Sequence, residues 1–108
     1  MPIATPERTV IVRQRRFDDV KVPKADLWYS IDWSEWLNGD DIASSNWIVP
    51  SDLTKTNENI DSGTKASVKI SGGKVGETYT VINRIVTVTG QETDERSFKI
   101  QIVELKEG

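Results

Sequence analysis

Two segments of the chain, 65–70 and 97–104, alternate regularly between apolar and polar residues. Residues two apart in a β-strand point to the same side of the sheet, so each segment predicts a strand with one apolar face. The residues predicted to face inward are Ala66, Val68 and Ile70 in the first segment, and Phe98, Ile100 and Ile102 in the second. Strands with one buried and one solvent-exposed face are typical of antiparallel sheets.

The long β-prone run between these segments, residues 77–89, carries aliphatic side chains on both of its faces. One face holds Tyr79, Val81 and Ile85 with Asn83 among them, and the other holds Ile82, Val86 and Val88 with Thr80 and Arg84. A solvent-exposed face would normally be polar. We therefore predict that the second face is covered, either by the N-terminal segment or by another subunit, and that Ile82, Val86 and Val88 contact a partner.

A glycine-rich stretch, residues 71–76, precedes this run and predicts a reversal of the chain. Glycine accepts positive φ at little steric cost, so Gly73 and Gly76 are expected to shape the corner. Tyr79 follows directly and resembles the tyrosine corner of immunoglobulin-like sandwiches, in which the hydroxyl bonds to backbone a few residues upstream. We predict that Tyr79 fixes this corner.

The segment from residue 27 to 39 predicts a strand followed by one helical turn. Residues 27–33 are aromatic and β-prone. Asp32 and Glu35 have the spacing of a capping box. In the turn that follows, Trp33 and Trp36 share one face with Leu37, and Asn38 with Gly39 provides a left-handed stop. The tryptophans are expected to close one end of the core.

Two further segments complete the predicted domain. Residues 42–50 predict another strand, in which Trp47 and Val49 alternate with Ile48, so that either face could be inward. Residues 51–64 are polar and rich in turn formers, so they predict a long loop with at most a weak edge strand near Leu53.

The N-terminal segment, residues 1–24, differs from the rest in charge and in proline content. It holds three prolines and six basic against three acidic residues, a net charge of +3, which leaves −6 for the remainder. We predict an extended basic arm with a short strand near 9–14, followed by one domain over 25–106. The arm docks on an acidic subunit or is a solvated terminus. Its candidate contact residues are Ile11, Phe17, Arg13, Arg15 and Arg16.

The composition of the 108 residues narrows the possible chemistry. The chain has no cysteine and no histidine, which excludes disulfides, thiolate nucleophiles, Ser-His-Asp triads and the usual zinc ligands. A net charge of −3 argues against nucleic acid as the main partner. No apolar run is long enough for a bilayer span or for a leader peptide, so the chain is expected to be intracellular at synthesis, without a membrane partner.

Two clusters of residues are candidate sites of chemistry. The carboxylates of Asp32, Glu35, Asp40 and Asp41 lie close together in the sequence, but they show no calcium-loop pattern and no sign of an opposed catalytic pair. Helix capping and a solvated loop explain them, and no metal or cofactor is expected. The tryptophans at 28, 33, 36 and 47 are expected to pack in the core, with a sugar-stacking platform as the alternative.

Four blocks of the sequence together resemble a phage protein family. They are Tyr-x-Ile-Asp-Trp-Ser-x-Trp-Leu at 29–37, Gly-Asp-x-Ile at 39–42, Gly-Gly-x-x-Gly-x-x-Tyr-x-Val-x-Asn-Arg at 72–84, and Gly-x-x-x-Asp-Glu-Arg-Ser at 90–97. In combination they are similar to the fibre-tail adaptor proteins of tailed phages and prophages.

This resemblance implies an all-β, immunoglobulin-like antiparallel β-sandwich with one short helical turn near residues 33–37. It also implies a virion structural protein of the tail or neck without enzymatic activity, present in the host cytoplasm before assembly. The expected partners are other phage structural proteins, with a homo-oligomer as a further possibility. A carbohydrate-binding module of a phage tip and a capsid decoration protein are the alternatives.

Overall fold

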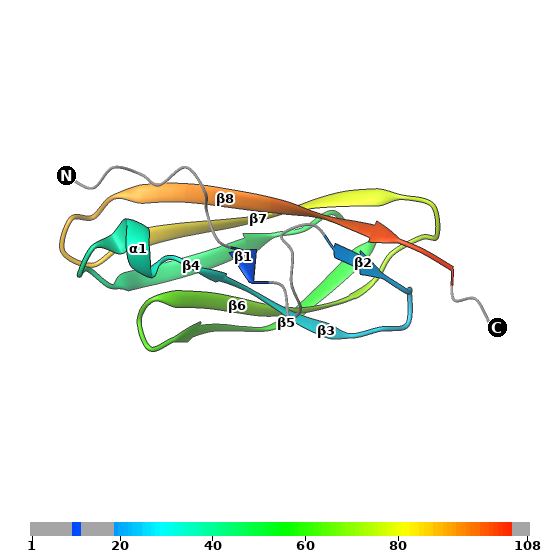
Figure 1. Ribbon diagram of the computed structural model, residues 1–108, viewed down its shortest axis with the longest axis horizontal. Helices are drawn as coiled ribbons and strands as arrows, with labels where there is room; N and C mark the ends of the chain where they lie inside the picture. The colour runs from blue at the N-terminus through cyan, green and yellow to red at the C-terminus, as the bar shows by residue number, and fades with distance from the viewer. Residues whose placement is uncertain (1–9, 12–18, 105–108) are drawn as a thin grey trace.

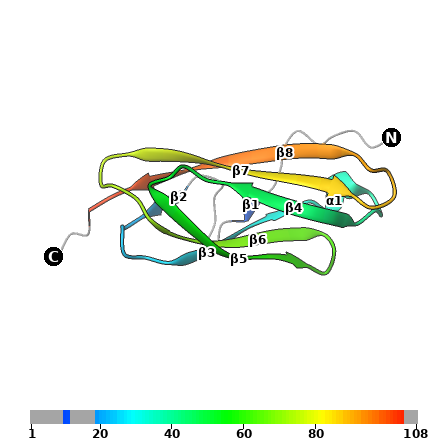
Figure 2. The same cartoon turned by 180° about the vertical axis from the view of Figure 1, so that it is seen from behind.

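The computed structural model describes residues 10–11 and 19–104. These residues form two four-stranded sheets that pack face to face, with one helical turn at one end (Figures 1 and 2). In chain order the elements are β1 (Val10–Ile11), β2 (Asp19–Lys21), β3 (Leu27–Asp32), α1 (Ser34–Leu37), β4 (Ile42–Ile48), β5 (Leu53–Asp61), β6 (Lys65–Gly72), β7 (Thr78–Thr87) and β8 (Thr93–Ile102).

The strand order is β1-β3-β6-β5 in the first sheet and β2-β8-β7-β4 in the second. The prediction of an all-β sandwich with one short helical turn is confirmed. Among the described strands, β2 pairs with β8 in parallel, whereas every other neighbouring pair is antiparallel. The order β3-β6-β5 facing β8-β7-β4 corresponds to the order B-E-D facing G-F-C of immunoglobulin sandwiches. The immunoglobulin-like part of the prediction stays a prediction, and this order agrees with it.

The core lies between the sheets and is built by the predicted alternation of β6, β7 and β8. Phe98 of β8 is at its centre, because its ring stacks on Tyr29 of the first sheet at 5.5 Å between centroids. Trp47 of β4 meets the same ring edge-on at 6.1 Å. Aromatic pairs in these geometries stabilise a fold beyond the area that they bury, by about 0.5–1.5 kcal/mol each.

A buried polar network lies beside this aromatic cluster. Asn83 of β7 is completely buried. Its side-chain oxygen accepts a hydrogen bond of 2.9 Å from the indole nitrogen of Trp33. Its side-chain nitrogen donates to the hydroxyl of Ser45 at 2.9 Å and to the carbonyl of Asn46 at 3.3 Å. The polar interruption in the inward face of β7 is therefore a junction between β7, β4 and the start of α1.

The helical turn lies where it was predicted, but the capping box does not form. Trp33, not Asp32, is the residue that caps α1, and its side chain makes no capping hydrogen bond. Asp32 accepts a bond from the backbone nitrogen of Ser34 instead. The indole of Trp33 donates a hydrogen bond to Asn83 and is buried in the core. These contacts hold Trp33 at the start of the turn without a reciprocal capping box. Asn38 ends the turn in the left-handed conformation, with φ 49°.

The prediction of a long loop over residues 51–64 is wrong, although the weak edge strand that was predicted near Leu53 is present and much longer than expected. Residues 53–61 form β5, a nine-residue strand at the edge of the first sheet that pairs with β6. The pairing shifts register between Thr56 and Asn59, where Asn57 has a φ of 53°. Because an edge strand is exposed along much of its length, its sequence can be polar, and periodicity alone did not reveal it.

The second sheet begins before the predicted boundary at residues 24 and 25. Residues of β2 pair with Ile100–Ile102 of β8, and Lys21 is buried. The Lys21 ammonium donates to the carbonyls of Val22, Pro23 and Gly72, at 2.9, 3.2 and 2.7 Å. Burial lowers the pKa of this amine, and the nearby carboxylate of Asp26 partly offsets the effect. Lys21 therefore acts as a link between the sheets, and it is not available as part of a basic docking arm.

The glycine corner joins β6 to β7. The phenol of Tyr79 accepts a bond of 3.0 Å from the backbone nitrogen of Lys74 and donates one of 2.9 Å to the Asp52 carboxylate. It is therefore bonded to backbone five residues upstream, as predicted, but to a nitrogen and with a second bond to a side chain. Burial is the main cause that raises the pKa of this phenol.

Replacing Tyr79 by Phe should lower the midpoint of thermal unfolding by roughly 2–10 °C, because both hydrogen bonds are lost at a buried position. The control is Thr80→Val, which removes one hydroxyl from the exposed face of the same strand and should change the midpoint little. Equal midpoints for Tyr79→Phe and the wild type would show that the hydroxyl does not hold the corner.

The two corner glycines should differ in their tolerance of alanine. Both have positive φ, 101° at Gly73 and 93° at Gly76. A Cβ at Gly73 would lie 2.6 Å from the end of Ile102, whereas a Cβ at Gly76 would meet nothing within 4 Å. We expect Gly76→Ala to cost roughly 1 kcal/mol from backbone strain alone, and Gly73→Ala roughly 2–4 kcal/mol because the core must also shift. Urea denaturation of the pair measures the difference, and equal costs would contradict the crowding at Gly73.

Candidate interaction surfaces

The outer face of the second sheet carries a small aliphatic patch, formed by Ile48, Ile82 and Val86. Ile48 of β4 lies directly across from Ile82 of β7, so the two side chains share this face. All three are half-buried. Val88, which was predicted to belong to the same face, follows the end of β7 and is 51% exposed. The structure thus brings Ile82 and Val86 together with Ile48, which was not among the predicted contact residues.

An ion pair divides this patch. Arg84 lies between Ile82 and Val86 along β7 and is paired in register with Glu95 of β8. Its Nε is 2.6 Å and its terminal nitrogen 2.5 Å from the same Glu95 oxygen. Both side chains are nearly half exposed, and such pairs contribute about 0–1 kcal/mol to stability. Their main effect is to hold two long side chains flat on the sheet between the aliphatic residues.

The N-terminal candidates are only partly within the described residues. The backbone of Ile11 belongs to β1, which pairs with β3, whereas Phe17, Arg13, Arg15 and Arg16 lie outside the described residues. The two N-terminal strands flank different sheets, β1 beside β3 and β2 beside β8. Strands at these positions extend the sheets sideways, so within the described part of the chain neither covers the outer face of β7.

The four tryptophans do not form a common platform. Trp33 and Trp47 are buried in the core, and Trp36 is partly buried against it at the α1 end. Trp28 is 41% exposed on the outer face of the first sheet, where the Lys69 ammonium lies 6.0 Å from its ring. Trp33 and Trp36 meet edge-on, whereas Trp28 and Trp47 lie elsewhere, and core packing accounts for Trp33 and Trp47.

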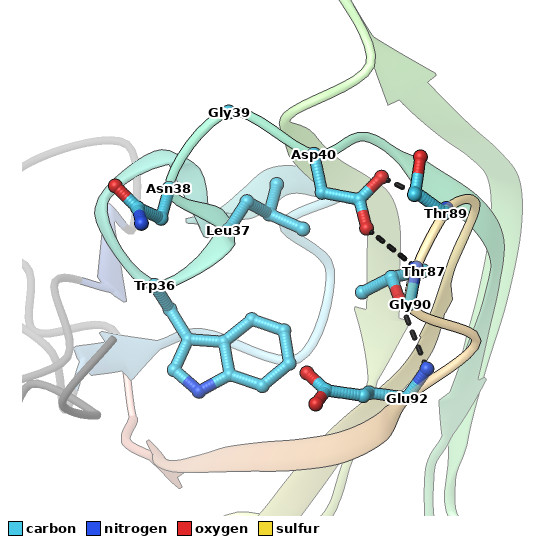
Figure 3. A pocket seen from close by; sticks show the side chains of 9 residues that line it. All are labelled: Trp36, Leu37, Asn38, Gly39, Asp40, Thr87, Thr89, Gly90 and Glu92. Carbon is cyan, nitrogen blue, oxygen red and sulfur yellow. Dashed lines mark hydrogen bonds between the residues drawn. The ribbon is translucent and has the colours of Figure 1, made fainter. Parts of the chain in front are cut away.

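A pocket of about 390 Å³ lies at the α1 end, between α1, the loop after it and the β7–β8 turn (Figure 3). Trp36 and Leu37 supply its apolar wall. Asp40 and Glu92 supply carboxylates from opposite sides, and the Glu92 carboxylate points toward the indole of Trp36 (Figure 3). Trp36 was expected to close the core, and its partial exposure makes it a wall of this pocket as well.

The carboxylate of Asp40 has a structural task of its own. It accepts backbone hydrogen bonds from Thr89 and Gly90, both at 3.0 Å, and from Asp41 at 2.7 Å. These bonds hold the pKa of Asp40 well below its ordinary value of 3.8, at about 2, because each donor favours the ionised form. Asp40 therefore clamps the loop after α1 to the β7–β8 turn.

Within the described residues no group of three acidic side chains is placed to hold a metal ion.

The Asp40 clamp predicts a specific dependence on acid. A carboxylate with a lowered pKa in the folded state stabilises the fold above the pKa of the unfolded chain, and the contribution is lost as the pH falls toward 2. Asp40→Asn should lower the urea midpoint at pH 7, and its difference from the wild type should shrink between pH 4 and pH 2. The control is Asp41→Asn, at an exposed position next to the clamp. An Asp40 carboxyl that titrates near pH 4 by NMR would rule the clamp out.

Comparison with known proteins identifies one family whose model matches most of this chain. The family described as podophage GP4 fiber-tail adaptor protein gp77 matches residues 21–101. Searches of curated proteins and of solved structures found no match. The matched range begins at the end of β2 and ends within β8, so it includes the aliphatic patch, the Asp40 clamp and the pocket. The resemblance found in the sequence blocks is thereby confirmed, and the chain belongs to the family of podophage GP4 fiber-tail adaptor proteins, gp77.

Proposed function

We propose that this protein is a non-enzymatic structural protein of the virion that joins tail or neck components through protein–protein contacts. The family description supports an adaptor role. The single observation that carries the proposed contact is the aliphatic patch of Ile48, Ile82 and Val86. It lies on the outer face of a sheet whose other face already packs in the core.

The patch has the composition of a small interface centre. Apolar side chains at the middle of a contact contribute most when a partner removes them from water. The Arg84–Glu95 pair can remain intact in such a contact, so that no single charge is left buried without a partner. Thr93 and Ser97 of β8 lie across from Val86 and Ile82 and supply a polar margin. A protein surface of similar size, with an apolar centre and a polar rim, fits this face.

The remaining parts of the proposal extend the same role. The partners are other phage structural proteins, and further copies of this chain can be among them; nucleic acid and membrane lipid are not expected partners. Within the described part of the chain no helix is long and apolar enough to cross a membrane. The protein is proposed to act in the virion tail or neck after synthesis in the host cytoplasm. Residues 1–24 supply a second contact through Ile11, Phe17 and the arginines.

No observation favours the alternatives. A carbohydrate-binding tip module would need exposed aromatic side chains on one surface, but Trp28 lies on the outer face of the first sheet, whereas Trp36 lines the pocket between α1 and the β7–β8 turn. A capsid decoration protein could use the same aliphatic patch, but the family description names a fibre-tail adaptor.

The adaptor proposal predicts that charging the patch blocks assembly without unfolding the protein. Ile82→Lys with Val86→Lys should reduce incorporation into phage particles by roughly tenfold or more, because two ammonium groups would have to be desolvated in the contact. Incorporation is measured by quantitative mass spectrometry of particles from a phage that lacks the gene and receives it from a plasmid.

The matched control is Thr54→Lys with Thr56→Lys, which places the same charge on exposed positions of the first sheet. Circular dichroism and urea denaturation of the purified variants establish that both are folded. Normal incorporation of the folded patch variant would rule out this face as a contact, and equal loss in the control variant would show that added charge alone blocks assembly.

A further inference from the structure

The pocket at the α1 end combines the two groups that recognise an arginine side chain. Trp36 offers the face or edge of a partly buried indole, and the carboxylate of Glu92 points toward it (Figure 3). A guanidinium can stack on an indole and bond to a carboxylate in the same plane. Among the described residues, no basic side chain forms a salt bridge with Glu92.

The molecule already contains one such arrangement next to the pocket. The guanidinium carbon of Arg96 lies 4.5 Å from the ring centroid of Trp33, and its terminal nitrogen is 3.5 Å from the Asp94 carboxylate. Trp33 in turn meets Trp36 edge-on at 5.6 Å between centroids. In this tryptophan pair, the guanidinium of Arg96 therefore covers the indole of Trp33. The indole of Trp36 faces the pocket, where the Glu92 carboxylate points toward it.

The charges of the described residues are concentrated at the same end. The segments that meet there are 32–42, 61–65 and 84–96, which hold eight acidic and three basic residues, a net charge of −5. The other described residues hold six acidic and six basic residues, a net charge of zero. Figure 1 shows that α1, the β5–β6 turn and the β7–β8 turn lie together at this end. Such a field attracts a cationic partner segment.

We propose that this pocket binds an arginine side chain from the N-terminal segment of a second copy of the chain. That segment supplies the complementary chemistry, because residues 13–17 contain Arg13, Arg15 and Arg16 next to Phe17. The contact joins different surfaces of the two copies, so it can be repeated from copy to copy around a ring. The proposal rests on the proposed function only in that several copies meet in one particle.

The direct test is titration of the full-length protein with a synthetic peptide of residues 8–18, followed by NMR of the tryptophan indole nitrogens. We expect the Trp36 signal to shift and the signals of Trp28, Trp33 and Trp47 to stay nearly constant. Glu92→Gln and Trp36→Leu should each weaken binding by about two- to fivefold, as expected for one exposed charge pair and one exposed cation–π contact. The matched control is Glu77→Gln, which removes an exposed carboxylate outside the pocket.

A second peptide, with lysine in place of all three arginines, separates arginine recognition from general attraction of charge. It keeps the positive charge but loses the planar group that stacks and pairs, so it should bind more weakly than the native peptide. Equal binding of both peptides, or equal loss with Glu92→Gln and Glu77→Gln, would overturn the arginine pocket.

Complementation of two variants tests whether the occupant comes from a second copy. One variant carries Arg13→Gln, Arg15→Gln and Arg16→Gln with an intact pocket, and the other carries Glu92→Gln and Trp36→Leu with an intact segment. Sedimentation should show little association of either variant alone and a dimer in the mixture. If the mixture stays monomeric while the peptide still shifts the Trp36 signal, the segment binds the pocket of its own chain. This result would overturn binding between two copies.

These outcomes are independent of particle assembly. Loss of peptide binding with normal sensitivity of incorporation to Ile82→Lys and Val86→Lys would remove the arginine pocket and leave the adaptor proposal standing. The reverse result would remove the aliphatic contact and leave the pocket.

Discussion

The side chain of Asn83 is the contact on which the register of β7 and the position of α1 depend. Its amide is completely buried, where an unsatisfied polar group would cost about 1–3 kcal/mol. Three hydrogen bonds, to Trp33, Ser45 and Asn46, satisfy it. A slip of β7 by one residue would turn Asn83 to the outside and place Ile82 or Arg84 inward, so the network sets one register. It also fixes the indole of Trp33, on which Arg96 and Trp36 pack.

The edges of the sandwich show how a small β protein avoids unwanted pairing. Lys55 of the edge strand β5 reaches across to the carbonyl of Trp47, at 2.5 Å, and pairs with Glu58 at 2.9 Å. Arg96 points inward from β8, which among the described residues pairs with β7 on one side but has no strand on its other side along residues 93–99. Inward-pointing cations on edge strands make addition of a further strand costly. The faces and the α1 end are therefore better suited to partner contacts than the strand edges.

Much of this fold could be predicted from local pattern, and the failures have physical reasons. The alternation of apolar and polar residues predicted β6, β7 and β8 and their inward faces, because the two faces of each strand have different surroundings. Strand β5 was predicted only as a weak edge strand near Leu53, because its apolar residues, Leu53 and Ile60, stand only near its ends. The pocket could not be predicted, since Trp36 and Glu92 are far apart in the sequence and come together only in the folded sandwich, where Asp40 joins their loops. The burial of Lys21 could not be predicted, because the sequence does not distinguish a buried lysine from an exposed one.

The parallel pairing of β2 with β8 gives the molecule a direction of mechanical resistance. The first strand of the second sheet lies beside the last, and residues 19–21 run in the same direction as residues 100–102. A force that drew the chain before β2 and the chain after β8 apart along the strand axis would shear all of these backbone bonds at once. The ammonium of Lys21, held by three carbonyls, would have to leave at the same moment. The chain therefore resists a pull in this direction more strongly than one that would open the β2–β8 pair one bond at a time.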